Sequence, residues 1–358
     1  MLAKSMLTKS MLAKSSFLRA CRCLPTEQVP VWFMRQAGRS LPEYRELRGE
    51  GSMLETIACP EVATEITLQP VRRYGVDAAI LYSDIMVPVH AIGFGVDIVP
   101  GVGPVVAQPF RTAKDLQRLR PLEPTEDTSY VLQTVTNLVA ELAKLHVPLI
   151  AFAGAPFTVA SYLVEGGPSR THARTKSLMC SNPQLFCALL DRLGDLAIAS
   201  ISSQLTAGAS AFQLFDSWVG TLTVDQYRRF VLPTSKRVFA ELKQQHLDAP
   251  GIHFGVGTGE LLSLLAAAGA DVVGVDWRVQ LNDARQRLGN NVAVQGNLDP
   301  ALLLAEWPVV AKQATDVLAR NKGQPGHIFN LGHGVLPETD PAILEQLVGL
   351  VHGYRYAP

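Results

Sequence analysis

Two arginines four positions apart, Arg35 and Arg39, are the first residues of the chain whose type and spacing suggest chemistry. They follow the apolar run 30–34 directly, and Ala37 and Gly38 lie between them. An arginine guanidinium is a rigid fork of N–H donors that matches a carboxylate or a phosphate. If the chain turns helical here, both side chains point the same way, and the small residues leave room for backbone N–H groups to approach a ligand. The pattern predicts an anion-binding corner between a strand and a helix.

Polar residues also follow other apolar runs. Asp84 comes directly after the run 78–83, and His333 lies between two glycines after the run 327–331. A carboxylate in such a place can oppose a developing positive charge, and a histidine can move a proton near neutral pH. From the residues alone, Asp84 can equally cap the following helix, and His333 can be an ordinary loop residue.

The elements that would position these groups are short apolar runs that alternate with longer amphipathic stretches. The runs are rich in Val, Ile, Leu and Phe without polar alternation, which is typical of parallel strands buried on both faces. They predict an α/β fold, namely one closed (β/α)₈ barrel of the TIM type, with an open doubly wound sheet as the alternative. The segment 92–111 predicts a small β-hairpin insertion after strand 2. We expect strands at 30–34, 78–83, 148–153, 211–215, 251–256, 271–275, 292–295 and 327–331.

In a barrel of this type the residues that follow the strands meet at one rim, where active sites lie. We expect two of them, Asp276 and Asn297, to pack or to shape turns. The predicted rim contains Arg35, Arg39, Asp84, Asp216, Ser217, Asp276, Asn297 and His333.

The chain carries a series of motifs that resembles the uroporphyrinogen decarboxylase family, in the same order, from about Phe17 to Tyr354. The series opens with Trp32-x-Met34-Arg35-Gln36-Ala37-Gly38-Arg39-x-Leu41-Pro42-Glu43-Tyr44-Arg45. It continues through Ile66-Thr67-Leu68-Gln69-Pro70, Tyr82-Ser83-Asp84-Ile85, Phe152-Ala153-Gly154-Ala155-Pro156-Phe157-Thr158, Tyr162-Leu163-Val164-Glu165-Gly166-Gly167, Phe215-Asp216-Ser217-Trp218, Gly274-Val275-Asp276-Trp277, Gln295-Gly296-Asn297-Leu298-Asp299-Pro300 and Asn330-Leu331-Gly332-His333-Gly334.

This resemblance implies an enzyme that removes the four acetate carboxyl groups of uroporphyrinogen III. The product would be coproporphyrinogen III in porphyrin biosynthesis, made without a metal or an organic cofactor. The resemblance implies that Asp84, Arg35 and His333 take part in catalysis, and the proton donor stays open between Arg35 and His333. It also implies a homodimer. The residues implied to bind the substrate are Arg35, Gln36, Ala37, Gly38, Arg39, Asp84, Tyr162, Ser217 and His333.

Two other functions fit parts of the pattern. Zinc-dependent methyltransferases that act on corrinoid or thiol substrates share this type of barrel, but they need a cluster of His and Cys at the strand ends. His253 has no cysteine near it in the sequence. A tetrapyrrole-binding protein without catalytic activity could keep the arginines and Asp84 for binding alone.

Composition narrows the class of protein further. The 358 residues are 47% hydrophobic and 18% charged, which suits a large folded core, and the net charge of zero gives no basic excess for nucleic acid. Five cysteines with irregular spacing argue against a disulfide framework and predict reduced thiols. Reduced thiols are typical of the cytoplasm, so we expect a cytoplasmic protein. No apolar run is long enough to span a membrane.

The first residues stand apart from the rest. The pentads 1–5, 6–10 and 11–15 are near-copies of one another, and no acidic residue occurs before Glu27. We interpret residues 1–16 as a disordered tail or leader, with import into an organelle as the alternative. Residues 17–358 are expected to form a single barrel domain.

Overall fold

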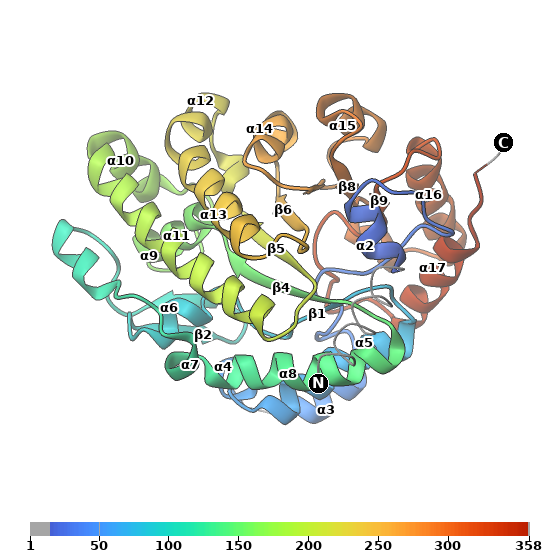
Figure 1. Ribbon diagram of the computed structural model, residues 1–358, viewed down its shortest axis with the longest axis horizontal. Helices are drawn as coiled ribbons and strands as arrows, with labels where there is room; N and C mark the ends of the chain where they lie inside the picture. Colours follow the sequence, from blue (N-terminus) through green and yellow to red (C-terminus); the bar gives the residue numbers. More distant parts are fainter. Residues whose placement is uncertain (1–14, 50, 357–358) are drawn as a thin grey trace.

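The computed structural model describes residues 15–49 and 51–356, and its central feature is a curled parallel sheet with helices around it (Figure 1). Seven strands of the described chain form the sheet, and every neighbouring pair is parallel. Their order is β1 (Ala79–Ile80), β4 (Leu149–Gly154), β5 (Ala211–Asp216), β6 (Gly251–Gly255), β7 (Val272–Gly274), β8 (Ala293–Gln295) and β9 (His327–Ile328).

The remaining predicted strand, 30–34, closes the barrel but is shortened to a single bridge. Val31 pairs in parallel with Phe329 on one side, and its carbonyl accepts the Asp77 N–H on the other side at 2.8 Å. Pro30 has no N–H to give to a ladder, and the Val31 N–H is taken by the Asp77 carboxylate at 2.7 Å. The barrel prediction is confirmed, with its first strand reduced for these reasons.

Helices cover the outer face of the sheet (Figure 1). The longer ones are α5 (Pro60–Tyr74), α8 (Ser129–Leu145), α9 (Pro156–Glu165), α10 (Ala173–Ser181), α11 (Pro183–Thr206), α13 (Leu232–Gln245), α15 (Leu281–Leu288), α16 (Trp307–Arg320) and α17 (Pro341–Gly353). The shorter ones are α2 (Ser16–Cys21), α3 (Pro42–Arg48), α4 (Met53–Ile57), α6 (Val87–Ala91), α7 (Pro124–Asp127), α12 (Val224–Gln226) and α14 (Leu262–Ala267). Single turns occur at η1 (Ala113–Arg118), η2 (Val219–Thr221), η3 (Tyr227–Val231), η4 (Gly259–Leu261) and η5 (Pro300–Leu304).

The amphipathic stretch 224–245 is divided into α12, the π-helical turn η3 and α13. Pro233 lies at the start of α13. A proline inside a continuous helix lacks the N–H for the carbonyl four residues earlier and collides with it. A wider π turn accommodates that break.

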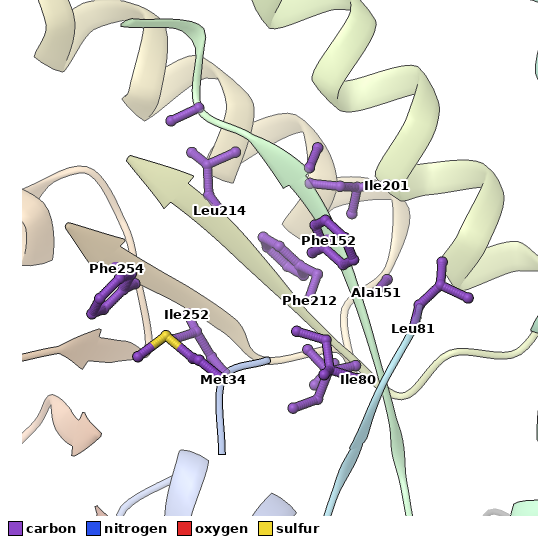
Figure 2. Close-up of a cluster of buried hydrophobic side chains, with 14 of the residues drawn as sticks. Met34, Ile80, Leu81, Ala151, Phe152, Ile201, Phe212, Leu214, Ile252 and Phe254 are labelled. Atoms are coloured by element: carbon purple, nitrogen blue, oxygen red, sulfur yellow. The ribbon is translucent and has the colours of Figure 1, made fainter. Parts of the chain in front are cut away.

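The barrel interior combines apolar side chains with one polar chain. Trp32 donates to Gln295 at 3.0 Å, and Gln295 donates to Gln213 at 3.0 Å. Gln213 is in β5 and Gln295 in β8, which are not neighbours in the sheet, so the bond between them crosses the interior. Figure 2 shows part of the surrounding hydrophobic core, with labelled side chains from β4, β5 and β6.

The predicted β-hairpin, which follows the second predicted strand at 78–83, is present in the structure. β2 (Val96–Val99) and β3 (Gly103–Val106) pair antiparallel, and Gly101 in the connection has a φ of +78°, which glycine adopts without strain. Residues 1–14 of the expected tail lie outside the described residues. Its last two residues belong to the fold, because Ser15 caps α2 and Ser16 is its first residue.

None of the helices in the described chain has the length and apolar character that crossing a membrane requires. The cysteines at 21, 23, 59, 180 and 187 are all free thiols.

Candidate active site

The corner after residues 30–34 is not helical, in contrast to the prediction from the arginine spacing. Arg35 has a φ of +59°, the chain runs through turns as far as Ser40, and helix α3 begins only at Pro42. Arg35 and Arg39 are both exposed. Their relative direction is therefore set by the turns of the loop and not by a helical repeat.

Gln36 stabilises this corner through hydrogen bonds of its side chain. Its side chain is 0% exposed, its amide oxygen accepts the Phe33 N–H at 3.0 Å, and its amide N–H₂ donates to the Ala78 carbonyl at 3.1 Å. The Gln36 side chain makes these two bonds within the protein, and its expected contact with the ligand stays a prediction. Gln36 positions the arginine loop on the neighbouring strand.

The two small residues of the loop, Ala37 and Gly38, are half-buried. A Cβ on Gly38 would lie 3.0 Å from the Arg35 carbonyl oxygen, so the loop needs glycine there for its own packing. The backbone N–H groups of Ala37, Gly38 and Arg39 have no acceptor within residues 15–49 and 51–356. They are available to a ligand that approaches from the rim.

Asp84 follows β1 and is half-buried at the rim. Its Oδ1 accepts the Met86 N–H at 2.8 Å, just ahead of α6, so one oxygen has the capping role that the sequence left open. Its Oδ2 has no hydrogen-bond donor in the described part of the chain. Burial raises the pKa of Asp84, whereas the Met86 N–H and the positive charge of Arg35 act in the opposite direction.

Tyr162 lies in α9, after β4, and faces the same charges. Burial and the negative charge of Asp84 raise the pKa of Tyr162 to about 12, and Arg35 acts against them. Arg35 therefore lies close to both Asp84 and Tyr162. The Tyr162 ring packs on Trp218 with 4.1 Å between ring centroids. Ser217, the residue before Trp218 in the sequence, is half-buried.

His333 lies in the loop after β9, and its two flanking glycines serve the protein itself. A Cβ on Gly332 would overlap the backbone of Trp277, and a Cβ on Gly334 would overlap the side chain of Arg35. Nδ1 of His333 accepts the Gly334 N–H at 2.7 Å, so in the neutral ring Nε2 carries the proton and is a donor.

The surroundings of His333 change its expected chemistry. Burial and the positive charges of Arg35 and Arg278 lower the pKa of His333 to about 4. At pH 7 about one molecule in a thousand is then protonated. This shift disfavours His333 as the acid near neutral pH, and the choice of proton donor between Arg35 and His333 stays a prediction.

Asp216 ends β5 but does not join the rim. Its carboxylate is 0% exposed, accepts the Thr158 hydroxyl at 2.8 Å and lies 3.7 Å from Nε2 of His253, which is also buried. Side chains alternate along a strand, so Asp216 points the opposite way from Phe215 and from the interior residue Gln213. It faces the helices that surround the barrel.

Asp276 and Asn297 hold loops together, as expected. Asp276 accepts the backbone N–H groups of Gly257 and Arg278, and Asn297 donates to the carbonyls of Asp276 and Val279. The Arg278 side chain pairs with Asp276 at 3.2 Å. Sequence reasoning missed Arg278 as a rim residue, although its place two residues after a strand-end aspartate was a usable signal.

Within the described ranges, no group of three or more His, Cys, Asp or Glu side chains is arranged to hold a metal ion. Arg35 thus lies near a carboxylate, a phenol and an imidazole N–H donor, those of Asp84, Tyr162 and His333. Arg39 belongs to the same loop as Arg35, and Ser217 precedes Trp218, on which Tyr162 packs. Such a set can bind several carboxylates around one buried negative charge.

Comparison with solved structures supports the fold. A methyltransferase from Methanosarcina mazei is 20% identical and has a TM-score of 0.77, with 94% of this chain and 97% of that chain covered. A B12-independent methionine synthase from Shewanella sp. W3-18-1 is 11% identical with a TM-score of 0.56, covering 86% of this chain and 89% of the other.

Comparison of sequences is more specific. A uroporphyrinogen decarboxylase from Thermobifida fusca is 60% identical over 94% of this chain and 92% of that protein. One from Salinispora tropica is 58% identical over 96% of this chain and 91% of that protein. The family model described as uroporphyrinogen decarboxylase (URO-D) matches residues 12–354. The chain therefore belongs to the uroporphyrinogen decarboxylase family.

Proposed function

We propose that the rim of this barrel binds uroporphyrinogen III and removes the carboxyl group from each of its four acetate arms, giving coproporphyrinogen III. The chain is a carboxy-lyase of porphyrin biosynthesis, in line with its 60% identity to a uroporphyrinogen decarboxylase along nearly its whole length. The observation that carries the mechanism is the position of Asp84, half-buried beside Arg35 and Tyr162 with one oxygen unpaired by the described chain.

Decarboxylation needs an acceptor for the electron pair of the bond that breaks, and the substrate can supply it. A proton added to a pyrrole ring carbon makes the ring cationic and conjugates it with the acetate arm. The C–C bond to the carboxylate then breaks, its electrons neutralise the ring, and CO₂ leaves. A second proton then completes the methyl group that replaces the acetate. Loss of the first proton from the ring carbon restores the pyrrole, so one proton is taken up in total for each CO₂ released.

Asp84 would oppose the positive charge on the ring. Its unpaired oxygen can accept hydrogen bonds from pyrrole N–H groups, and such bonds favour the ionised carboxylate. They act against the burial that raises its pKa in the free protein. Because the ring is more cationic in the transition state than in the bound substrate, this interaction lowers the barrier.

The other rim groups would hold carboxylate arms. Arg35, Arg39 and the unpaired backbone N–H groups between them supply donors to one part of the macrocycle, and Tyr162 and Ser217 supply hydroxyls to another. His333, neutral at pH 7, donates from Nε2 to an arm instead of supplying the proton. Arg35, whose charge acts on Asp84, Tyr162 and His333, is the proposed relay for a proton taken up from solvent.

We also propose that the protein is a homodimer in the cytoplasm. The family membership supports both statements, and light scattering at micromolar concentration tests the first. A mass equal to one chain would contradict it.

Release of CO₂ from uroporphyrinogen, measured with and without a metal chelator, tests the proposed activity. We expect release that the chelator does not change. Release abolished by the chelator would indicate metal-dependent chemistry. Binding of the macrocycle with no release would indicate a tetrapyrrole-binding protein.

A further inference from the structure

Arg278 is a rim arginine that the mechanism above does not use. It follows Asp276 and Trp277 at the end of β7, and 52% of its side chain is exposed. Its guanidinium carbon lies over the Trp277 ring, 4.0 Å from the ring centroid, so the cation packs on an aromatic face. Such stacking is favourable and restricts the orientation of the guanidinium.

The ion pair with Asp276 does not account for this placement. Asp276 is 1% exposed and already accepts two backbone N–H groups, from Gly257 and from Arg278 itself. The guanidinium adds one bond of 3.2 Å at a half-exposed position, and such pairs contribute about 0–1 kcal/mol. An arginine has five N–H donors, and only one of those of Arg278 has an acceptor among the described residues.

Arg278 and the arginine loop lie on two sides of the same imidazole. Trp277, under Arg278, contacts His333 with 6.4 Å between ring centroids. On the other side, Gly334 packs against the Arg35 side chain. The positive charges of Arg278 and Arg35 both act on His333, but only Arg35 acts on Asp84. Arg278 is therefore part of the same rim as His333.

We propose that Arg278 is a further substrate-binding residue, which holds a carboxylate arm of the tetrapyrrole that is not reacting. This inference rests on the proposed function. The fork is held over Trp277 and bonded to Asp276, and its remaining donors have no acceptor among the described residues. An arginine with free donors can recognise a carboxylate through two bonds at once. Because the arm is remote from the bond that breaks, Arg278 contributes equally to the binding of substrate and transition state.

The test compares three variants of the full chain. Arg278→Gln removes the charge, and Arg278→Lys keeps the charge without the planar fork. Arg72→Gln is the matched control, because Arg72 is also half-exposed, at 50%, and also paired with one carboxylate, Glu65. It lies near the carboxyl end of α5, which leads into the opposite end of the barrel.

The first readout is steady-state decarboxylation of uroporphyrinogen. For Arg278→Gln we expect KM to rise about tenfold with kcat within about threefold of the unaltered protein, as for uniform binding. Arg278→Lys should recover part of the loss, and Arg72→Gln should change neither constant. Unchanged KM in Arg278→Gln, or a fall in kcat alone, would overturn the proposal.

The second readout does not depend on turnover. Uroporphyrin, the oxidised macrocycle with the same arms, is titrated into each protein and followed by its fluorescence. We expect the Kd to rise about tenfold in Arg278→Gln and to stay unchanged in Arg72→Gln. Binding by the unaltered protein with no loss in Arg278→Gln would refute the role of Arg278 alone. No binding and no CO₂ release by the unaltered protein would refute the proposed function as well.

Discussion

Asp84 and Asp216 both occur at the carboxyl end of a barrel strand, and their carboxylates have opposite surroundings. Asp84 is half-buried at the rim, bonded to the Met86 N–H through one oxygen, with the other oxygen unpaired by the described residues. Asp216 is fully buried against the helix layer, where Thr158 and His253 surround it. An aspartate at the end of a strand thus keeps an oxygen accessible to a ligand in the case of Asp84. In the case of Asp216, the carboxylate is enclosed by other parts of the protein.

The difference between them shows what a strand-end position does and does not determine. The end of a parallel strand brings a side chain to the catalytic end of the barrel. Whether that side chain faces the rim or the helices depends on the alternation of the strand and on the turn that follows. We propose that Asp84, at the rim, binds the substrate, whereas Asp216 is enclosed in the outer layer, where its Oδ1 accepts the Thr158 hydroxyl.

The largest effect is expected from Asp84→Asn. This change keeps the shape but removes the charge that opposes the cationic ring, so kcat should fall by roughly 10² to 10³. Single-turnover release of CO₂ measures it, and near-UV circular dichroism checks the fold. Near-normal turnover by a folded variant would show that Asp84 is only a helix cap.

Asp216→Ala should mainly lower the stability of the protein, in contrast to Asp84→Asn, which mainly lowers kcat. It leaves the buried Thr158 hydroxyl without its acceptor, which costs about 1–3 kcal/mol in the free energy of unfolding. Urea denaturation measures this loss, and the thermal midpoint should fall with it. A variant that is fully stable but inactive would place Asp216 in the catalytic machinery and remove the distinction from Asp84.

His333 predicts a pH dependence of stability at the rim. Its folded pKa of about 4 lies below the ordinary value of about 6.5. As the pH falls, the unfolded chain therefore binds the proton before the folded one does. The contribution of His333 to the free energy of unfolding is fully present above pH 6.5 and is lost progressively toward pH 4. In His333→Gln, the decline between pH 7.5 and 5 should be smaller by about 1–2 kcal/mol. Identical urea midpoints against pH in both proteins would contradict the low pKa.

Arg39→Lys should have the smallest of these effects. The positive charge remains but the planar fork is lost, so KM should rise about tenfold, equivalent to ~1.4 kcal/mol, with little change in kcat. Steady-state kinetics with uroporphyrinogen measure it. A large fall in kcat with unchanged KM would instead place Arg39 with Asp84 at the reacting centre.

The sequence carried enough information for the barrel, because its strands are apolar runs that stand out locally, such as 148–153 and 251–256. The hairpin at β2 and β3 was visible from its glycines for the same reason. The rim residues Asp84 and His333 could be proposed because they follow such runs. In each case the signal lies within a few neighbouring residues.

Other features depend on contacts between distant parts of the chain and could not be predicted in the same way. The positive φ of Arg35 is held by Gln36, which is bonded to Ala78, and the low pKa of His333 arises from burial and from two arginines on other loops. The outward direction of Asp216 depends on Thr158 in α9. The contact of Arg278 with Trp277 joins neighbouring residues. Its place at the rim, however, is evident only from the contact between Trp277 and the distant His333.

The bridge between Val31 and Phe329 has a consequence for folding during synthesis. This short bridge joins the first part of the chain to Phe329, near its end, and directly above it Arg35 packs against Gly334. A nascent chain on the ribosome acquires Asp84 and Tyr162 early, but it cannot close the ring or place His333 until the last strand has emerged. Ring closure is thus a late event in synthesis, and His333 joins Asp84 and Tyr162 only after nearly the whole chain has been made.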